Sequence, residues 1–518
     1  MIYQVQFLPE LKFRVSLKSV MKSLWQKFHK IGDTLRLPNI PNWLCGLLFL
    51  VLILRIPSFF EPYYYGDEMV YMTLGQGVRQ GLSLYRDVYD NKPPLLYLAA
   101  ATADNLFWFK VILAFWMLIS SIWFYKLSKT LFGQNEGAQK ISTIVFAILT
   151  TLPLLEGNTV NSELFMIGFT ILALLTLLKH RLTSKRVLFA GILLGLGTLF
   201  KVPAAFDAPI IVVYWLITGD LKKEWKEIIK NTFVLILGFT LPIVLTFIWY
   251  YFAGALPEYI KAAFLQNIGY LSSFRPSDIQ KPFIIRNAPL LTRALIVLIG
   301  SIVIWFFRKK LSKRFILFAV WTLFALFAIT LSERPYPHYF IQVVAPISFL
   351  LTMFFTSKNI EQSLAVIPLA IAFTVPVLYK FYLYPTTSYY LRFVNFATHK
   401  INKSVYFDGF SSTTNRNYQI ALFLSQSSRK TDRVFMWDPD SAAVYSLAKR
   451  LPPIKYVVPY HVNDFSSRII IAKQIEANPP RFIILTSGNP YPELTVLIAN
   501  KYILLQQIDG ANIYSSLP

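Results

Sequence analysis

Residues 43–60 read WLCGLLFLVLILRIPSFF, and residues 61–68 continue directly as EPYYYGDE. A helix needs about 20 apolar residues to cross a bilayer, so this run predicts a first membrane span. The acidic pair Asp67 and Glu68 follows a few residues after the run ends. Because ionised carboxylates are costly next to lipid, their position predicts chemistry performed at the membrane surface.

The composition indicates that lipid is the solvent for most of the chain. Of its 518 residues, 55% are hydrophobic and 16% are aromatic, which is more than a soluble fold of this size buries. The formal net charge of +24 does not predict a nucleic-acid partner, because the basic residues cluster at the ends of apolar runs. Cys45 is the only cysteine, so no disulfide forms within the chain.

Further apolar runs predict a polytopic α-helical membrane protein of about eleven spans. After the first run they lie at 106–125, 141–155, 163–179, 187–202, 204–218, 232–253, 290–307, 314–331, 339–356 and 363–384. Basic residues fall on alternate loops, at 126–129, 179–186, 222–230 and 308–314. By the positive-inside rule these loops and the basic N-terminus are cytoplasmic, and the C-terminus is outside. We therefore expect an integral protein of a bacterial-type cell membrane.

Three parts are predicted along the chain. Residues 1–42 form a basic segment with apolar residues at helical spacing, which predicts an amphipathic helix on the inner leaflet or, alternatively, a loose basic tail. Residues 43–385 form the membrane domain. Its long outer loops, 61–105 and 254–290, are expected to contain interfacial helices and turns.

Residues 386–518 read as a soluble α/β domain on the outer face. Buried strands are predicted at 433–437 and 481–485, a hairpin at 503–514, and helices at 441–449 and 492–500. This alternation predicts an open sheet with a parallel part. The domain has no glycine-rich phosphate loop, so we do not expect catalysis there.

The outer loops contain two candidate catalytic carboxylates, Asp67 and Glu68, and two candidate substrate-binding residues, Lys92 and Tyr71. An enzyme that uses a lipid-phosphate sugar needs a carboxylate to take the proton of the acceptor hydroxyl, and fixed cations to hold the phosphate. The departing phosphate is already a competent leaving group, so no general acid is required. Asp67 and Lys92, which precedes Pro93, meet this need. The alternative is that Asp67 or Glu68 only caps a helix beginning near Met69.

Four other polar residues on the same side are candidates with simpler alternatives. Glu163 is expected to be a second catalytic carboxylate; the alternative is an acidic residue in the first helical turn, where the helix dipole favours it. Lys201 is expected to contact phosphate; the alternative is that its side chain snorkels to the membrane surface without a function. Arg334 suits bidentate phosphate binding. His338 is a metal ligand, a donor to phosphate, or an interfacial histidine. No metal-ligand spacing occurs in the sequence, so no cofactor is predicted, and a divalent metal stays an alternative that no motif supports.

These motifs resemble those of the C-type glycosyltransferase (GT-C) superfamily. The likeness is to bacterial relatives of the dolichyl-phosphate-mannose-protein mannosyltransferases and of the lipid A aminoarabinose transferases (glycosyltransferase families 39 and 83), and it covers about 43–384. The residues that carry it are Asp67-Glu68 with Tyr71, Lys92-Pro93, the segment 195–201 before a proline, and His338-Tyr339 followed by Pro346.

The resemblance implies an inverting glycosyltransferase. It would move a sugar from a polyprenyl-phosphate donor to a hydroxyl of a protein, glycan or lipid acceptor on the outer face. It further implies that Asp67 is the base and that Lys92 contacts the lipid phosphate. The aminoarabinose transferases have a Glu, linked to a zinc site, where this chain has Asn91. They have an Arg where this chain has Val70. Neither zinc nor aminoarabinose is therefore implied.

The alternative function is a polytopic transporter or lipid flippase. Such a protein predicts charges at mid-membrane and broken helices in paired halves. Here the charged residues gather at one rim instead. A non-catalytic membrane scaffold that displays the C-terminal domain is a third interpretation, and it would tolerate neutral residues at positions 67 and 92.

Overall fold

The structure is a computed structural model that describes residues 40–179, 181–269, 282–486 and 490–517. It divides into two compact units, Met1–Leu54 and Arg55–Pro518. The described part of the first unit is most of helix α2 (Asn42–Arg55). The amphipathic helix predicted within 1–42 lies almost entirely outside the described residues, as does part of the predicted outer loop 254–290.

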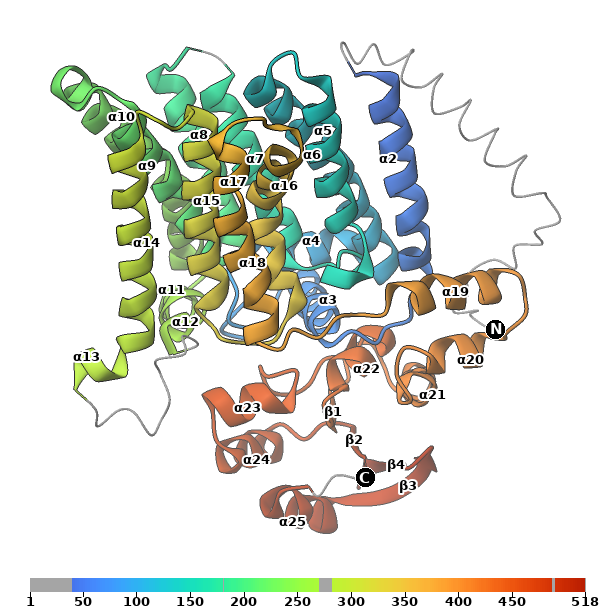
Figure 1. The fold of residues 1–518 in the computed structure, drawn as a ribbon. Coiled ribbons are helices and arrows are strands. Elements are labelled where there is room, and N and C mark those ends of the chain that lie inside the picture. The colour runs from blue at the N-terminus through green and yellow to red at the C-terminus, as the bar shows by residue number, and fades with distance from the viewer. Residues whose placement is uncertain (1–39, 180, 270–281, 487–489, 518) are drawn as a thin grey trace. The chain divides into compact units, whose positions relative to one another are not determined.

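The second unit is mainly helical as far as residue 378. Figure 1 shows its long helices running side by side. Its elements in this part are η1 (Ile56–Phe60), α3 (Gly66–Arg79), α4 (Leu95–Ala103), α5 (Leu106–Phe132), α6 (Glu136–Leu149), η2 (Pro153–Leu155), α7 (Ser162–Leu178), α8 (Ser184–Phe200), η3 (Val202–Asp207), α9 (Ala208–Thr218), α10 (Leu221–Phe252), α11 (Leu256–Ile260), the π-helical η4 (Lys261–Leu265), α12 (Gln266–Gly269), α13 (Phe283–Arg286), α14 (Ala288–Phe307), α15 (Lys313–Thr330), η6 (Pro337–Phe340), α16 (Ile341–Thr356), α17 (Ile360–Leu364) and α18 (Val366–Leu378).

Every apolar run predicted from the sequence contains a helix. Within the described ranges, seven helical segments are long and apolar enough to cross a membrane. They are Asn42–Phe60, Leu106–Phe132, Leu221–Phe252, Ala288–Phe307, Lys313–Thr330, Pro337–Thr356 and Ile360–Leu378. The runs at 141–155, 163–179, 187–202 and 204–218 form the shorter helices α6 to α9. The chain is therefore an integral membrane protein, and the total of about eleven spans stays a prediction.

The central helices approach one another closely through glycine. Helix α8 packs against α7 and α10. A Cβ atom placed on Gly191 or Gly195 of α8 would lie 2.3 Å from the backbone oxygen of Leu235 or Phe239 in α10. Small residues of this kind let two membrane helices pack backbone to backbone. This contact positions the end of α8, where Lys201 follows.

The predicted outer loop 61–105 folds into the two helices α3 and α4. Helix α3 begins at Gly66, and its N-cap is Tyr65, which makes no side-chain capping bond. Asp67 and Glu68 both lie in the first turn. The capping alternative is therefore wrong in detail, although carboxylates in a first turn are favoured by the helix dipole.

Residues 386–518 contain a small sheet with helices, as predicted. The elements are α19 (Thr386–Ala397), α20 (Lys403–Asp408), α21 (Thr414–Ser427), β1 (Val434–Trp437), α22 (Ser441–Ala448), α23 (Pro459–Phe465), α24 (Arg468–Ala477), β2 (Phe482–Leu485), α25 (Pro492–Lys501), β3 (Tyr502–Ile508) and β4 (Ala511–Ser516). The sheet order is β1-β2-β4-β3. Strands β1 and β2 are parallel, and β4 is antiparallel to both its neighbours.

The turn between β3 and β4 follows from the backbone conformation of its two central residues. Asp509 and Gly510 have φ values of 43° and 76°, which suits the two central positions of a type I′ turn between β3 and β4.

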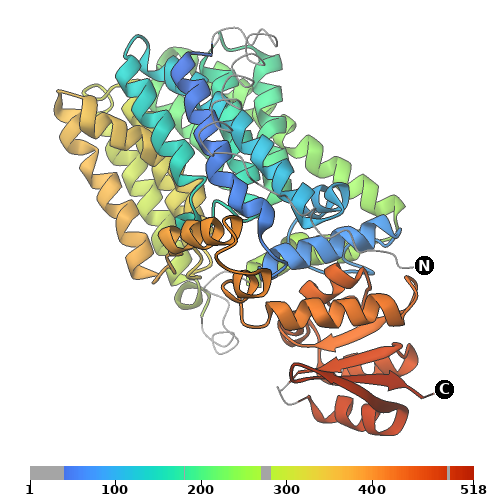
Figure 2. The same cartoon turned by 90° about the vertical axis from the view of Figure 1, so that its right-hand side faces the viewer.

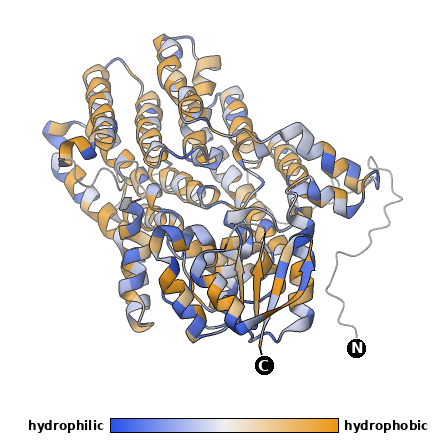
Figure 3. Ribbon diagram, turned by 90° about the horizontal axis from the view of Figure 1, so that it is seen from below, coloured by the Kyte–Doolittle hydropathy of each residue, from blue (hydrophilic) through white to orange (hydrophobic). Residues whose placement is uncertain are grey.

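Helix α22 packs on α3, where the Thr73 hydroxyl donates to the Ala442 carbonyl over 2.9 Å. Figures 2 and 3 show the sheet and the mixed polarity of this part beside the apolar helices.

Candidate active site

Asp67, in the first turn of α3, lies close to Lys92, which precedes the start of α4 by three residues. The Lys92 ammonium lies 3.6 Å from Asp67 Oδ2 and 3.7 Å from Asp90 Oδ2. The Tyr71 hydroxyl donates to Asp67 Oδ2 over 2.8 Å, one helical turn along α3. The Asp67 side chain is 34% exposed to solvent, whereas the Asp90 side chain is only 3% exposed. Asp67 is therefore the carboxylate of this group that a substrate can reach.

The two carboxylates beside Lys92 are held in their ionised form. Burial tends to raise the pKa of Asp67, but Lys92, His338 and the bond from Tyr71 bring it below its ordinary value. Burial also acts against ionised Asp90, yet Lys92, His461 and the Asn91 N–H lower its pKa strongly. An ionised Asp67 is ready to accept a proton at neutral pH.

The loop that carries Lys92 is fixed from several sides. The Tyr85 hydroxyl donates to the Lys92 carbonyl over 2.9 Å, and the Lys92 N–H donates to the Tyr97 hydroxyl over 3.2 Å. The Asn267 amide of α12 donates to the Asn91 carbonyl over 2.8 Å. The Tyr89 N–H donates to the Lys455 carbonyl over 2.9 Å. These bonds hold the cation in place before substrate arrives.

A second polar group joins Glu163, Lys201 and His338. Lys201 forms an ion pair with Glu163 at the start of α7, and its ammonium lies 3.9 Å above the Tyr339 ring. His338 Nε2 is 3.8 Å from Glu163 Oε1, and Nδ1 contacts Glu156. Three helix ends that are far apart in sequence therefore meet.

The group around Asp67 and Lys92 interacts electrostatically with the group around Lys201 and His338. His338 is close enough to Asp67 to lower its pKa. Asp67 and Lys92 also interact electrostatically with Lys201. The Tyr65 hydroxyl, two residues before Asp67, donates to Glu156 Oε1 over 3.1 Å. Carboxylates and cations are thus arranged around one polar region, which suits a ligand that carries both a phosphate and hydroxyl groups.

Glu68 lies in a different environment from Asp67. It is fully buried and lies 2.6 Å from the ammonium of Lys110, which is also 2.7 Å from Glu61. The Asn158 amide donates to Glu61 over 2.7 Å. Consecutive residues of a helix point about 100° apart, so Asp67 faces the open region while Glu68 faces the core. This placement gives no support to the predicted catalytic role of Glu68 and favours a structural one.

The remaining predicted residue, Arg334, lies exposed on the loop between α15 and η6. Its neighbour Glu333 pairs with Arg293. Contact of Arg334 with a phosphate stays a prediction. Across the described ranges, no three His, Cys, Asp or Glu side chains form a group suited to a metal ion.

Sequence reasoning did not select Asp90, Glu156 or Lys110 as site residues. Lys110 carried a usable signal, because it is a cation inside a membrane-length apolar run and such a residue demands a partner. Asp90 lies only two residues before Lys92. Glu156 has a left-handed φ of 57° in a tight turn, which no local pattern indicated.

Comparison with known proteins reveals one family match and several structural relatives. Residues 92–250 match the model of the dolichyl-phosphate-mannose-protein mannosyltransferases. The structure is similar to ArnT from Cupriavidus metallidurans bound to undecaprenyl phosphate, with a TM-score of 0.57, 14% identity, and coverage of 92% of this chain and 98% of that one. For the apo state of ArnT the TM-score is 0.54, at 13% identity and the same coverage.

A more distant match is the archaeal oligosaccharyltransferase AglB from Archaeoglobus fulgidus in complex with an inhibitory peptide and a dolichol-phosphate. Its TM-score is 0.45, at 13% identity, and the match covers 92% of this chain and 74% of that one. Among curated proteins no relative matches the chain. The family match and the ArnT structures confirm the expected resemblance: the chain has the fold of the GT-C glycosyltransferases, and its residues 92–250 resemble the dolichyl-phosphate-mannose-protein mannosyltransferases.

Proposed function

We propose that the chain is an inverting glycosyltransferase that moves a sugar from a polyprenyl-phosphate donor to an acceptor hydroxyl. The observation that carries the proposal is the Asp67–Lys92 contact of 3.6 Å, in which a reachable acid lies beside a fixed cation. The GT-C fold supports it, and so does the undecaprenyl phosphate bound in the ArnT relative. We infer that the same class of lipid phosphate binds beside Lys92.

The proposed reaction is a single displacement. The acceptor oxygen forms a bond to the anomeric carbon while its proton passes to a carboxylate oxygen of Asp67. The bond between the anomeric carbon and the phosphate oxygen breaks, and its electron pair stays on the departing lipid monophosphate. Attack from the face opposite the leaving group inverts the anomeric carbon. Lys92 stabilises the charge that develops on the phosphate.

The second polar group would complete the phosphate site. Lys201 and His338 lie near Asp67 electrostatically and offer donors to a phosphate, and Arg334 is a further candidate. Glu163 pairs with Lys201, so we assign it the role of holding that cation rather than of a second base. Tyr71 orients Asp67 through its hydrogen bond of 2.8 Å.

We further propose that this reaction takes place on the outer face. The basic loops at the opposite ends of the helices support a cytoplasmic N-terminus and an extracytoplasmic C-terminus. Residues 43–385 would form the catalytic membrane domain, and residues 386–518 would position the acceptor. The bond between Tyr89 and Lys455 supports the second role, because it joins the C-terminal part to the loop of Lys92.

The test compares purified wild type with Asp67→Asn in liposomes that contain labelled polyprenyl-phosphate sugars and cell-envelope acceptors. Loss of a general base costs about 100-fold or more in rate, so Asp67→Asn should release almost no label. Asp87→Asn, in the same loop and bonded to Arg86 instead, should stay close to wild type. Equal turnover by Asp67→Asn would remove Asp67 from the chemistry. Absence of turnover by wild type with every donor would contradict the proposed function.

A further inference from the structure

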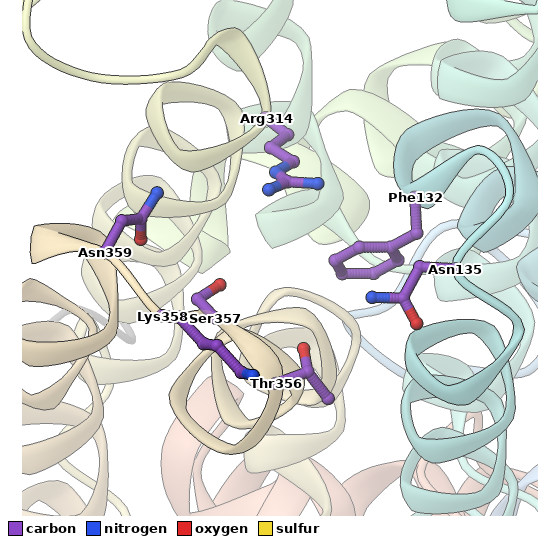
Figure 4. Close-up of a pocket in the computed structure, with 7 residues that line it drawn as sticks. All are labelled: Phe132, Asn135, Arg314, Thr356, Ser357, Lys358 and Asn359. Carbon is purple, nitrogen blue, oxygen red and sulfur yellow. The ribbon is translucent and has the colours of Figure 1, made fainter.

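A polar cavity lies at the ends of the helices opposite to the candidate active site. Its volume is about 350 Å³, and it is lined by Phe132, Asn135, Arg314, Thr356, Ser357, Lys358 and Asn359. These residues come from the end of α5, the N-cap of α6, the start of α15, the end of α16 and the short link between α16 and α17 (Figure 4). Because His338 precedes the other end of the 16-residue helix α16, the cavity and the active site are about 24 Å apart.

The charge of the cavity is positive. Arg314 and Lys358 are its charged lining residues, and among the residues that the structure describes no carboxylate lines it. The Arg314 Nε atom is buried, and among the described residues it has no hydrogen-bond partner. The guanidinium lies 5.7 Å from the centre of the Phe132 ring. A buried donor that lacks a partner destabilises the fold unless a ligand or water satisfies it.

The carboxylate of Glu361, two residues after Asn359, is already used elsewhere. Both oxygens of Glu361 accept hydrogen bonds from Ser312, one from its N–H and one from its hydroxyl. Helices α5 and α16 end beside the cavity, whereas α6 and α15 begin there, so the effects of their dipoles largely cancel. The electrostatic potential in the cavity is therefore set by the two cationic side chains. Figure 4 shows Arg314 and Phe132 facing Ser357 and Thr356 across the space. The hydroxyl and amide side chains around the cations are suited to phosphate oxygens.

Apolar side chains beside the cavity indicate which kind of phosphate it binds. Phe355 and Ile360, on either side of Lys358, are exposed at 68% and 65%. In an integral membrane protein such side chains contact acyl chains. Basic pockets between membrane helices bind the headgroups of anionic lipids in the same way. The neighbouring loop 308–314 is also basic, which favours the leaflet that carries anionic lipid.

We propose that this cavity is a binding site for the phosphate headgroup of an anionic phospholipid, held by Arg314 and Lys358 with its acyl chains along Phe355 and Ile360. Bound lipid would tie together the ends of α5, α6, α15 and α16. The site would stabilise the folded membrane domain from the side opposite to the reaction. This proposal does not depend on the proposed transferase activity.

The test measures thermal unfolding of the purified full chain in neutral detergent. Mixed micelles with phosphatidylglycerol are compared with phosphatidylcholine micelles and with inorganic phosphate. Because a ligand that binds only the folded state stabilises it, phosphatidylglycerol should raise the melting temperature of wild type by about 3 °C over phosphatidylcholine. Native mass spectrometry of the same samples should show retained phosphatidylglycerol.

The variants separate charge at the cavity from charge nearby. Arg314→Gln with Lys358→Gln should abolish the shift, whereas Lys309→Gln with Lys310→Gln, which removes the same charge from exposed positions, should keep it. Ser357→Trp fills the cavity without changing its charge and should also abolish the shift. An undiminished shift in the Arg314/Lys358 variant or in Ser357→Trp would overturn the proposal. If the Arg314/Lys358 variant does not fold, Ser357→Trp decides the question. An equal shift with inorganic phosphate would indicate a soluble anion site and contradict the lipid.

Discussion

Two adjacent carboxylates of α3 have opposite electrostatic environments. Asp67 lies near Lys92, His338 and Tyr71, and its pKa falls below the ordinary value. Glu68 is fully buried, and burial together with the nearby Glu61 raises its pKa to about 7, although Lys110 partly offsets this. Glu68 therefore holds its proton more tightly than an ordinary glutamate does.

The raised pKa of Glu68 predicts that stability falls as pH rises. The folded state keeps a proton on Glu68 up to about pH 7, whereas the unfolded chain loses it near its ordinary value. The contribution is therefore complete below about pH 4.5 and is lost as pH approaches 7, with a slope of at most about 1.4 kcal/mol per pH unit. Melting in detergent from pH 5 to pH 8 should show this fall for wild type.

The variant Glu68→Gln isolates this group. Gln keeps a carbonyl oxygen for the Val160 N–H but does not titrate. The melting temperature of Glu68→Gln should vary less with pH than that of wild type. At pH 8 the variant should melt at a higher temperature than wild type. Glu136→Gln, which changes an exposed acid of α6, should follow the wild-type curve. Identical pH curves for Glu68→Gln and wild type would show that Glu68 does not titrate in this range.

At the scale of elements, the glycines of α8 set the distance to α10. The backbone oxygens of Leu235 and Phe239 come so near Gly191 and Gly195 that no side chain fits between the helices. Because α8 ends directly before Lys201, a shift of α8 also moves a cation of the candidate active site.

Gly195→Ala should therefore destabilise the protein. Its Cβ atom would lie 2.3 Å from the Phe239 oxygen and 2.6 Å from a ring carbon of Pro242, so the helices must separate. We expect a loss of about 2 to 3 kcal/mol, seen as a lower melting temperature in detergent. Gly137→Ala is the matched control, since the nearest atom to its Cβ is 3.5 Å away and alanine favours a helix. Equal melting of the two variants would contradict this account of the α8–α10 contact.

At the scale of the whole molecule, the C-terminal part touches the loop that carries Lys92. His461 Nε2 of α23 lies 3.4 Å from Asp90 Oδ1, and Asp90 lies 3.7 Å from Lys92. The Tyr89 ring packs against His461 and Tyr456. His461 therefore acts on the cation through Asp90, as a positioning residue.

His461→Gln should lower the turnover of the proposed transferase by about tenfold without a matching loss of stability, because a small displacement of Lys92 weakens its hold on the phosphate. The rate should fall more than the apparent affinity for the donor. Asp464→Asn, three residues along α23 and exposed, should behave as wild type. A lower melting temperature that fully explains the lost activity would reduce His461 to a structural role.

The predicted orientation is testable with single cysteines in a Cys45→Ser background. Lys430→Cys, exposed in the C-terminal part, should react with a membrane-impermeant maleimide on intact cells. Lys309→Cys, exposed at the end opposite to the active site, should react only after the membrane is opened. The reverse pattern would place the C-terminus inside and would contradict the outer-face reaction.

The sequence alone predicted most elements because their signals are local. Apolar runs mark the membrane helices, and the strands at 434–437 and 482–485 differ from the expected ranges by a single residue. Side-chain caps such as Asn105 and Ser312 begin helices where the runs begin. The sequence also predicted that Asp67 and Lys92 lie on one side of the membrane, because counting the basic residues in each loop requires no knowledge of helix packing.

Only the tertiary structure decided which polar residues meet. His338 and Glu156 are 182 positions apart, and Lys110 pairs with acids 42 and 49 positions earlier. The sequence predicted that Asp67 and Glu68 lie at the membrane rim, but it did not predict that one faces the open region and the other the core. That difference depends on how α3 is rotated against its neighbours. Helix rotation is set by the packing of distant segments, which no local pattern contains.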